Sequence, residues 1–425
     1  MNFRRVTLVF FSKTKLVPCV VILYRIISKS RRNFLKKSEI KYVNWKPKSR
    51  IKNLFLDISS LVFVDHGGGI QRVQKSLVEN WSIFPPKEFR VVPIYFCDSE
   101  NQFKYANREQ VPSWNPSERI PTNPVEMAQG DYYLNTDLNY KFVIKHEEFY
   151  KALQKNRINI YFMVYDLLPL TLPNFFPEGI SEFHKKWFEF AARNAKLISI
   201  SNTVANEIRA WGTNKQIPIQ VATIHLGSNL IKNPISVEET FVNVKQQPPF
   251  RFLMVGTLEP RKGHDQVLSA FEILWRKGTD ATLTFVGKKG WKVEDLLSRI
   301  ETHEYFNKKL FWLSELDDIE LVQTYKNSTA LINASFGEGL GLPIVEASAY
   351  GLPLILRDLP VFNEIAGENA WYFETRSDLV LADSIMNWIG DYSHGEVAYN
   401  RNVRIYSWQE TCNQITDIFT EHGFK

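Results

Sequence analysis

The chain has 425 residues, of which 44% are hydrophobic and 23% charged, and its formal net charge is +6. This composition is that of a globular protein, and at this length we expect two domains, because one hydrophobic core stops growing beyond ~250–300 residues. Its cysteines, Cys19, Cys97 and Cys412, show no C-x-x-C pairing. The spacing argues against both a zinc site and a disulfide framework, and it favours a reducing, cytosolic environment.

The positive charge is concentrated in a leader, residues 1–52, which holds fifteen Lys or Arg side chains and one acidic residue. Its longest uncharged run after Lys15, Leu16–Tyr24, has nine residues, well short of the ~20 needed to span a bilayer. A signal peptide is not indicated either, because Arg25 and further basic residues follow the run. The leader is therefore not expected to span a membrane or to be cleaved.

We predict that residues 1–50 adsorb to an anionic membrane surface, through apolar side chains at the headgroup boundary and Lys or Arg on lipid phosphates. The protein would then lie on the cytoplasmic face of the membrane. A disordered basic tail is an alternative interpretation. A nucleic-acid-binding tail is another, but the body of the chain is acidic and offers no continuing basic groove, so no nucleic-acid partner is expected.

Past the leader, short β-branched and aromatic runs alternate with longer polar or periodic stretches, which is typical of βαβ units and parallel sheets. The first series of runs comprises residues 52–58, 91–97, 159–166, 196–201 and 219–226. A polar stretch ending in two prolines, residues 233–249, predicts an interdomain linker. The second series comprises residues 250–256, 281–287, 309–313, 329–334 and 352–356, with a helix predicted over residues 265–278.

These patterns predict two α/β domains in tandem, over residues 51–240 and 241–425, with the last helix packing back on the first domain. In open α/β sheets, ligands bind at the carboxyl ends of the strands. The sequence therefore predicts a site between the two sets of strand ends.

Two features of the first domain are candidates for that site, and a histidine is not. Gly67, Gly68 and Gly69 follow the first strand, where a glycine loop can approach bound phosphates; a plain glycine turn is the alternative. Asp166 ends a buried strand and can orient a substrate hydroxyl, or it can cap a helix. His225 follows a later strand and is interpreted as a hydrogen-bonded core residue.

In the second domain, the stretch GTLEPRKG follows an apolar strand and opens a helix. It places Arg261 and Lys262 near backbone amides at a helix start, where fixed cations can bind a phosphate group. The alternative is a turn in which both cations are solvated.

The stretch NASFGEGLGLPIVEASAYGLPLIL, residues 333–356, carries two glutamates within a glycine-rich apolar segment. Its helix is predicted to begin at Leu342 or Pro343, so that Glu338 precedes the helix and Glu346 lies about one turn inside it. Carboxylates in these places can bind sugar hydroxyls at different depths of one cleft. Alternatively, Glu338 caps the helix and Glu346 is a paired or solvated helical residue.

Several of these motifs together resemble the retaining glycosyltransferases of family 4, whose E-x7-E motif is met by Glu338 and Glu346. The resemblance covers residues 250–375 closely, through the stretches SFGEGLGLPIVEASAYGLPLILRDLPVFNEIAG, FLMVGTLEPRKGHDQVLSAFEIL, LTFVGKKGW and LFWLSELDDIELVQTYKNSTALINAS. YDLLPLTLPNFFP and GGGIQRV extend it more weakly into the first half. It implies an α/β protein of GT-B fold, with two facing Rossmann-like, doubly wound domains and a central cleft.

The resemblance also implies roles for individual residues in binding a nucleotide sugar. Glu346 would bind the donor ribose, and Glu338 the transferred sugar together with the backbone of Gly339, Leu340 and Gly341. Many relatives have an arginine directly after the strand glycine Gly256, where this chain has Thr257. Arg261 is then the candidate replacement, beside Lys262. Tyr165 stands where relatives often have a histidine, so no histidine role is assigned there.

The expected reaction is retaining hexosyl transfer, with a donor phosphate oxygen as proton acceptor and no protein nucleophile. The chain contains no D-x-D motif, so we expect no metal and no cofactor beyond the nucleotide sugar. GDP-mannose is the favoured donor, because VGTLEPRKGH and YDLLPL most resemble bacterial polysaccharide mannosyltransferases, and the acceptor would be a lipid-linked or polysaccharide glycan. The alternatives are a UDP- or dTDP-hexose donor, a nucleotide-sugar epimerase of the same fold, and a non-catalytic glycan-binding protein.

Overall fold

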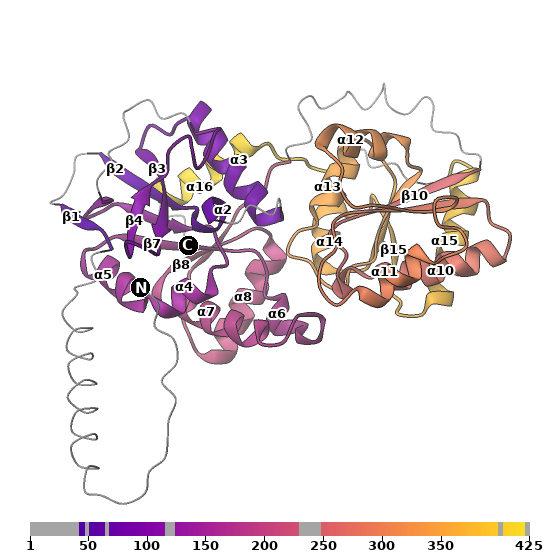
Figure 1. The fold of residues 1–425 in the computed structure, drawn as a ribbon, viewed down its shortest axis with the longest axis horizontal. Helices are drawn as coiled ribbons and strands as arrows, with labels where there is room; N and C mark the ends of the chain where they lie inside the picture. The colour runs from indigo at the N-terminus through magenta and orange to yellow at the C-terminus, as the bar shows by residue number, and fades with distance from the viewer. Residues whose placement is uncertain are drawn as a thin grey trace, which may run out of the picture.

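The computed structural model describes residues 42–46, 51–63, 68–114, 124–228, 248–397 and 403–420. Most of the basic leader, Gly67 and most of the predicted linker lie outside these residues, so the structure does not address the expectations for them. Within the described residues, two large parallel sheets lie side by side, each covered by helices (Figure 1). No helix in these ranges is both long enough and apolar enough to span a bilayer.

The first sheet has seven strands within the described residues, all parallel except for an antiparallel edge strand. In spatial order they are β4 (Gln102–Tyr105), β3 (Phe89–Cys97), β2 (Lys52–Asp57), β6 (Tyr132–Asn135), β7 (Asn159–Val164), β8 (Lys196–Ser199) and β9 (Val221–Thr223). A small separate pair joins β1 (Asn44–Lys46) to β5 (Glu126–Ala128). The helices that accompany this sheet are α2 (Ser59–Phe63), α3 (Gly69–Ile83), α4 (Tyr140–Lys145), α5 (Glu147–Lys155), α6 (Leu168–Thr171), the 3-10 turn η1 (Pro173–Phe175), α7 (Ile180–Asn194) and α8 (Asn202–Lys215).

The second sheet has six described strands, all parallel, in the doubly wound order in which the chain begins in the middle and moves first to one edge and then to the other. In spatial order they are β12 (Leu310–Leu313), β11 (Ala281–Val286), β10 (Phe250–Val255), β13 (Ala330–Asn333), β14 (Leu354–Arg357) and β15 (Trp371–Phe373). Its helices are η2 (Pro260–Lys262), α10 (His264–Arg276), α11 (Glu294–Glu301), α12 (Asp318–Asn327), α13 (Leu342–Ala349), α14 (Pro360–Ala366) and α15 (Asp378–Ser393).

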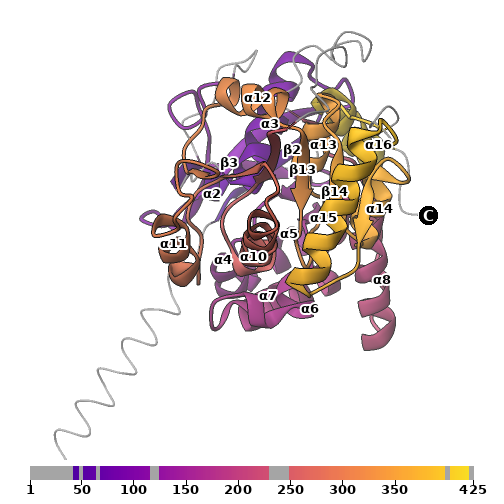
Figure 2. The same cartoon turned by 90° about the vertical axis from the view of Figure 1, so that its right-hand side faces the viewer.

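Both sheets are buried on both faces, which is why their strands are nearly continuous apolar runs. Along β2, Leu54 and Leu56 pack on one face and Phe55 on the other. Along β10, Phe252 and Leu253 likewise belong to different cores. Helices α10 and α15 lie together on one face of the second sheet (Figure 2). Full burial of one such large side chain contributes about 1.5–3 kcal/mol, so each sheet is fixed between its two layers of helices.

The last described helix, α16 (Trp408–Thr420), leaves the second domain and packs on α3 of the first (Figure 1). The ring of Phe419 stacks on Tyr132 with 5.1 Å between centroids, and the Tyr132 hydroxyl donates to the Phe419 carbonyl oxygen at 3.1 Å. The chain therefore crosses between the domains a second time near its end.

One central strand was missed by the sequence analysis. Strand β6 lies between β2 and β7 and pairs with both in parallel. It has four residues, YYLN, and polar Asp131, Thr136 and Asp137 flank it closely, so neither alternation nor an apolar run marks it. Its identity depends on pairing with distant strands, which a local pattern does not reveal.

Candidate active site

The loop after β10 carries two cations to the start of α10. It leaves the sheet at the switch point, where β10 lies between β11 and β13. Pro260 opens the 3-10 turn η2, a position that suits its fixed φ and its missing N–H. Gly263 then adopts φ +77°, a left-handed conformation that favours glycine, before α10 begins. Arg261 and Lys262 are thus held in one short turn.

The loop after β13 carries Glu338 to the same switch point. Its start is fixed by Asn333, whose side-chain oxygen accepts a hydrogen bond from the Ser335 amide at 3.2 Å. Its end is Gly341, with φ +104°, directly before α13. The two loops are joined by their backbones, because the Phe336 amide donates to the Arg261 carbonyl oxygen at 2.8 Å.

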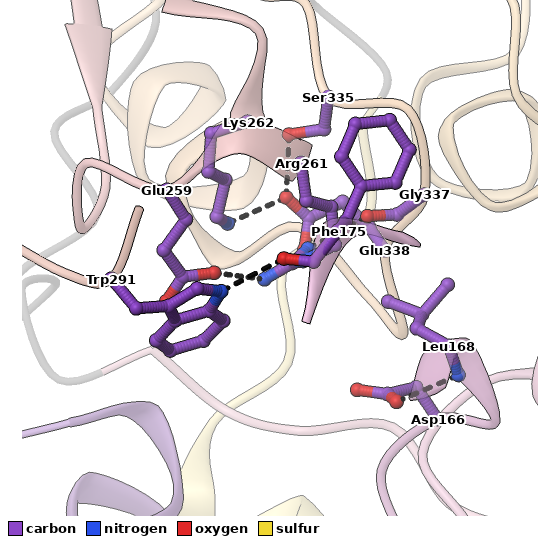
Figure 3. A network of polar contacts seen from close by, with 10 residues as sticks. All are labelled: Asp166, Leu168, Phe175, Glu259, Arg261, Lys262, Trp291, Ser335, Gly337 and Glu338. Atoms are coloured by element: carbon purple, nitrogen blue, oxygen red, sulfur yellow. Dashed lines mark hydrogen bonds and ion pairs between the residues drawn. The ribbon is translucent and has the colours of Figure 1, made fainter. Parts of the chain in front are cut away.

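Glu338 is bound by both cations (Figure 3). Its Oε1 accepts from Lys262 Nζ at 2.5 Å and from the Ser335 hydroxyl at 2.7 Å, and its Oε2 accepts from Arg261 at 2.9 Å. Arg261 also donates to the Gly337 carbonyl oxygen at 2.7 Å and to Glu259 at 3.1 Å. All the described hydrogen bonds of this carboxylate therefore come from the two loops.

The side chains of this network are largely buried, so their charges interact strongly. The Glu338 side chain is 9% exposed, and those of Arg261 and Lys262 are 12% and 15% exposed. Burial opposes ionisation of Glu338, but the charges of Lys262 and Arg261 outweigh burial and lower its pKa to about 2. Among the described residues, the buried Nε of Arg261 has no hydrogen-bond acceptor. The site thus holds an ionised carboxylate against two cations at a helix start, a place where anions are favoured.

The first domain places Asp166 against the Glu338 loop. Asp166 follows β7, and its Oδ1 accepts from the amide of Leu168, the first residue of α6, at 3.0 Å, although the N-cap of this helix is Leu167. A side chain at Gly339 would overlap the Tyr165 carbonyl oxygen and come within 3.2 Å of Asp166 Cβ. Burial raises the pKa of Asp166, and the charge of Arg261 partly opposes this rise. The end of β7 therefore packs directly against the loop that carries Glu338.

Several contacts hold the first domain on this loop. The Ser201 hydroxyl donates to the Gly339 carbonyl oxygen at 2.8 Å. The side chain of Leu340 lies in the core cluster of the first domain. Trp291 donates to the Phe175 carbonyl oxygen at 2.8 Å, and the Phe175 ring stacks on Phe336 with 5.2 Å between centroids. The first domain therefore packs on the loop that carries Glu338, and Figure 3 shows the Trp291–Phe175 hydrogen bond beside it.

The second glutamate, Glu346, belongs to a different network. It lies on α13, is 5% exposed, and accepts from the Tyr325 hydroxyl at 2.8 Å. Arg72 of α3, in the first domain, approaches its Oε1 at 3.7 Å and also donates to Asp318 at 3.5 Å. Burial raises the pKa of Glu346. The structure therefore separates the two glutamates, with Glu338 beside Lys262 and Glu346 beside Arg72.

The glycine loop of the first domain is only partly described, because Gly67 lies outside the described residues. Gly68 is the N-cap of α3 with φ −72°, and Gly69 is its first residue, so neither uses a left-handed conformation. The position of Arg72 shows that the start of α3 faces Glu346 and Asp318 of the second domain. The predicted approach to phosphates remains a prediction.

The other predicted donor residues lie beside the cations. Gly256 has φ +146°, and the Lys262 side chain passes within 3.6 Å of where its Cβ would be. Thr257 lies next to the loop after β11, where a side chain at Gly287 would approach its amide. His225 is hydrogen-bonded to Gln414 and stacked on Tyr406, away from this network. In the part of the chain that the structure describes, no three His, Cys, Asp or Glu side chains form a metal-binding group.

The sequence analysis did not identify several partners in these networks. Glu259 and Ser335 lie inside the quoted motifs, but nothing in their spacing marks them as contacts of Arg261 and Glu338. Tyr325 lies inside the quoted stretch of residues 310–335 but was not singled out there, and Ser201 is a helix cap outside the quoted motifs. Only the fold brings them to the site.

Comparison with known proteins gives one family and several relatives. Residues 237–404 match the model of Glycosyl transferases group 1. The chain is 35% identical over 378 residues to the serotype-specific mannosyltransferase WbdA of Escherichia coli, an alignment that covers 86% of this chain and 46% of WbdA. It is 25% identical over 263 residues to O-antigen chain mannosyltransferase B of Escherichia coli, covering 60% of this chain and 68% of that protein. The chain thus spans about half the length of WbdA.

Solved structures share the fold at low sequence identity. The crystal structure of Anabaena Alr3699/HepE in complex with UDP and glucose has a TM-score of 0.59 and 15% identity, covering 87% of this chain and 100% of that chain. Sucrose-phosphate synthase from Thermosynechococcus elongatus has a TM-score of 0.55 and 14% identity, covering 88% of this chain and 96% of that chain. At these identities the likeness is one of architecture alone.

Proposed function

Because the chain carries a glycosyl transferases group 1 domain on a GT-B fold, we propose that it transfers a hexose from a nucleotide sugar to a glycan. The observation that carries the proposal is the Glu338–Lys262–Arg261 network at the switch point of the second sheet. Ligands of doubly wound sheets bind at this position. The first domain supplies Asp166 from the facing side.

The two cations suit the departing nucleoside diphosphate. Negative charge develops on the diphosphate as the glycosidic bond breaks, so cations fixed at that point stabilise the transition state more than the ground state. Lys262 and Arg261 donate short hydrogen bonds to Glu338 in a largely buried site, where electrostatic interactions are stronger than in water. They would exchange part of their interaction with Glu338 for the diphosphate when the donor binds.

Glu338 would then bind hydroxyl groups of the transferred sugar, with the backbone of Gly339, Leu340 and Gly341. Its pKa of about 2 keeps it ionised at neutral pH, so it accepts hydrogen bonds and does not donate a proton. Asp166 would orient the attacking acceptor hydroxyl. Transfer with retention needs no protein nucleophile in this scheme, and a donor phosphate oxygen takes the proton of that hydroxyl.

GDP-mannose is the proposed donor and a lipid-linked or polysaccharide glycan the proposed acceptor. Two relatives with mannosyltransferase in their names support the sugar, and the name of one refers to O-antigen chains. Peripheral attachment of residues 1–52 to the cytoplasmic face of a membrane is proposed from their charge. A non-catalytic glycan-binding protein would leave the cationic diphosphate site without a leaving group to stabilise.

A transfer assay on the full chain tests this proposal. The protein is incubated with GDP-mannose, UDP-glucose or dTDP-glucose, with and without a mannose-containing glycan, and both free nucleotide and extended glycan are measured. We expect glycan extension with GDP-mannose only when the acceptor is present. Preference for UDP or dTDP sugars overturns the donor assignment, conversion of a donor without acceptor identifies an epimerase, and binding without turnover identifies a glycan-binding protein.

A further inference from the structure

Arg357 is a buried cation at the end of β14, next to the candidate site but outside its ion network. It is 6% exposed, and its guanidinium makes four hydrogen bonds in the structure. Two go to the Ala334 carbonyl oxygen, at 3.1 and 3.0 Å, one to the Thr375 carbonyl oxygen at 2.5 Å, and one to Gln266 Oε1 at 2.6 Å. All of these acceptors are neutral oxygens.

Burying a cation without a counterion is costly, so this arrangement needs an explanation. Within the described residues, Arg357 forms no ion pair with a carboxylate. Burial lowers its pKa to about 10, and the nearby charge of Arg376 adds to this effect. The two guanidinium groups approach the same Phe336 ring, at 4.1 and 5.3 Å from its centroid. A neutral apolar side chain would cost less free energy to bury at this position. We therefore interpret the guanidinium as a group that holds its hydrogen-bond acceptors in a fixed arrangement.

The acceptors of Arg357 show what that geometry fixes. Ala334 is the first residue after β13 and begins the loop that carries Glu338. Gln266 lies in the first turn of α10, four residues after Lys262, and its side-chain nitrogen donates in turn to Thr375 at 3.1 Å. The planar guanidinium group has five N–H donors and can bind the oxygens of Ala334, Thr375 and Gln266 at once, whereas the single ammonium group of a lysine cannot.

The two loops of the site meet at the point that Arg357 holds. A side chain at Gly263, directly after Lys262, would overlap the Ala334 carbonyl oxygen, so the loops are in contact there. Phe336, whose amide joins the loops, lies between the Arg357 guanidinium and the Phe175 ring of the first domain. Fixing Ala334 therefore fixes the spacing between Lys262 and Glu338.

We infer that Arg357 is a positioning residue, which sets the distance between the Glu338 loop and the Lys262 loop without touching substrate. This inference deepens the proposed function and rests on it where activity is concerned. A misplacement of ~1 Å in such a site can cost about 100-fold in rate, so a small shift of Ala334 is expected to be visible in turnover. Arg357 lies within the family-like stretch of residues 335–367, but the resemblance assigns it no role and the ion network does not include it.

The test compares Arg357→Lys with Arg299→Lys in the full chain. Arg299 is the matched control, because it also holds several acceptors in the second domain, among them Asp265 at 2.7 Å and Ser269 at 2.9 Å, both on α10, while none of its described hydrogen bonds goes to residues 334–341. We expect Arg357→Lys to lower kcat for mannose transfer about 10- to 100-fold with a change in KM for GDP-mannose below about 3-fold. Arg299→Lys is expected to keep both values.

Hydrogen exchange provides a readout that does not depend on activity. Deuterium uptake of residues 334–341 should rise in Arg357→Lys and not in Arg299→Lys, while both variants keep the wild-type melting temperature within about 2 °C. Gln266→Met removes the hydrogen bond between Arg357 and Gln266, and it should raise the deuterium uptake of residues 334–341 less than Arg357→Lys does. It serves as the test variant if Arg357→Lys folds poorly.

The outcomes separate the two proposals. Unchanged exchange of residues 334–341 in both Arg357→Lys and Gln266→Met overturns the positioning role, whether or not the protein transfers sugar. Wild-type protein that transfers no sugar, with increased exchange in Arg357→Lys, overturns the proposed function and keeps the positioning role. A wild-type kcat for a well-folded Arg357→Lys also overturns the inference.

Discussion

At the residue scale, the central feature is one carboxylate shared by two cations. Removing the charge of Glu338 frees Lys262 and Arg261 for the diphosphate, but it removes the proposed sugar ligand. We therefore predict that Glu338→Gln binds GDP about 3- to 10-fold more tightly while mannose transfer falls about 100-fold. Calorimetry gives the first value and a transfer assay the second. Glu294→Gln, at an exposed pair with Lys289, is the control, and a parallel loss of GDP affinity in Glu338→Gln would contradict the role.

A second prediction concerns Glu207 on α8. Burial, and then the charge of Asp166, raise its pKa well above the ordinary range of a glutamate, to about 7. The folded state therefore binds the proton more tightly than the unfolded state, and Glu207 lowers stability as pH rises from about 5 to 8. Glu207→Gln removes this effect, so the melting temperature of the variant minus that of wild type should be larger at pH 8 than at pH 5. Because the group is partly exposed, we expect a gain of only a few degrees. An equal difference in melting temperature at both pH values would show that Glu207 does not titrate in this range.

At the element scale, the loops of the site depend on close backbone approach. Gly339→Ala would drive a Cβ into the Tyr165 carbonyl oxygen, so the loop could not pack on the end of β7. We predict a loss of transfer of at least about 100-fold, while the second domain keeps its fold. Gly390→Ala in α15 is the control, since a Cβ there meets nothing within 4 Å and alanine favours helix. Transfer assays with circular dichroism check this, and wild-type turnover in Gly339→Ala would refute the tight packing.

The elements themselves differ in how well the sequence predicts them. The ten strands expected from apolar runs all appear, because strands buried on both faces need such runs. The short β6 was missed because its pairing with β2 and β7 is not a local property. Lys262 and Glu338, 76 residues apart, were each selected from a motif and are in contact in the structure. Residues 237–404 match the glycosyl transferases group 1 model, and the GT-B fold is confirmed. The contact of Arg72 with Glu346 depends on how the two domains meet, which no local motif specifies.

At the scale of the whole molecule, the two domains are held together across the site. Glu364 of α14 accepts from the amides of Asn202 and Thr203 and from the Thr203 hydroxyl, each at 2.7 Å, at the start of α8. A carboxylate at a helix N-terminus is favoured by the helix dipole, so this contact stabilises the observed docking. It joins the second domain to the helix whose cap, Ser201, also binds the Glu338 loop.

We predict that Glu364→Gln weakens this docking. The radius of gyration from small-angle scattering should increase and KM for the donor should rise about 3- to 10-fold, because both domains contribute to the site. Glu368→Gln, at an exposed glutamate four residues further along the chain, is the control and should change neither value. A scattering curve and KM identical to wild type in Glu364→Gln would show that other contacts alone hold the domains.

The most direct measurement of the central claim is the rate of mannose transfer from GDP-mannose by Lys262→Ala, compared with Lys289→Ala. Both lysines lie in the second domain, but only Lys262 contacts Glu338, whereas Lys289 is half exposed and pairs with Glu294. The site described above predicts a fall of about 100-fold or more in Lys262→Ala and no change in Lys289→Ala. Transfer by Lys262→Ala at the wild-type rate would contradict it.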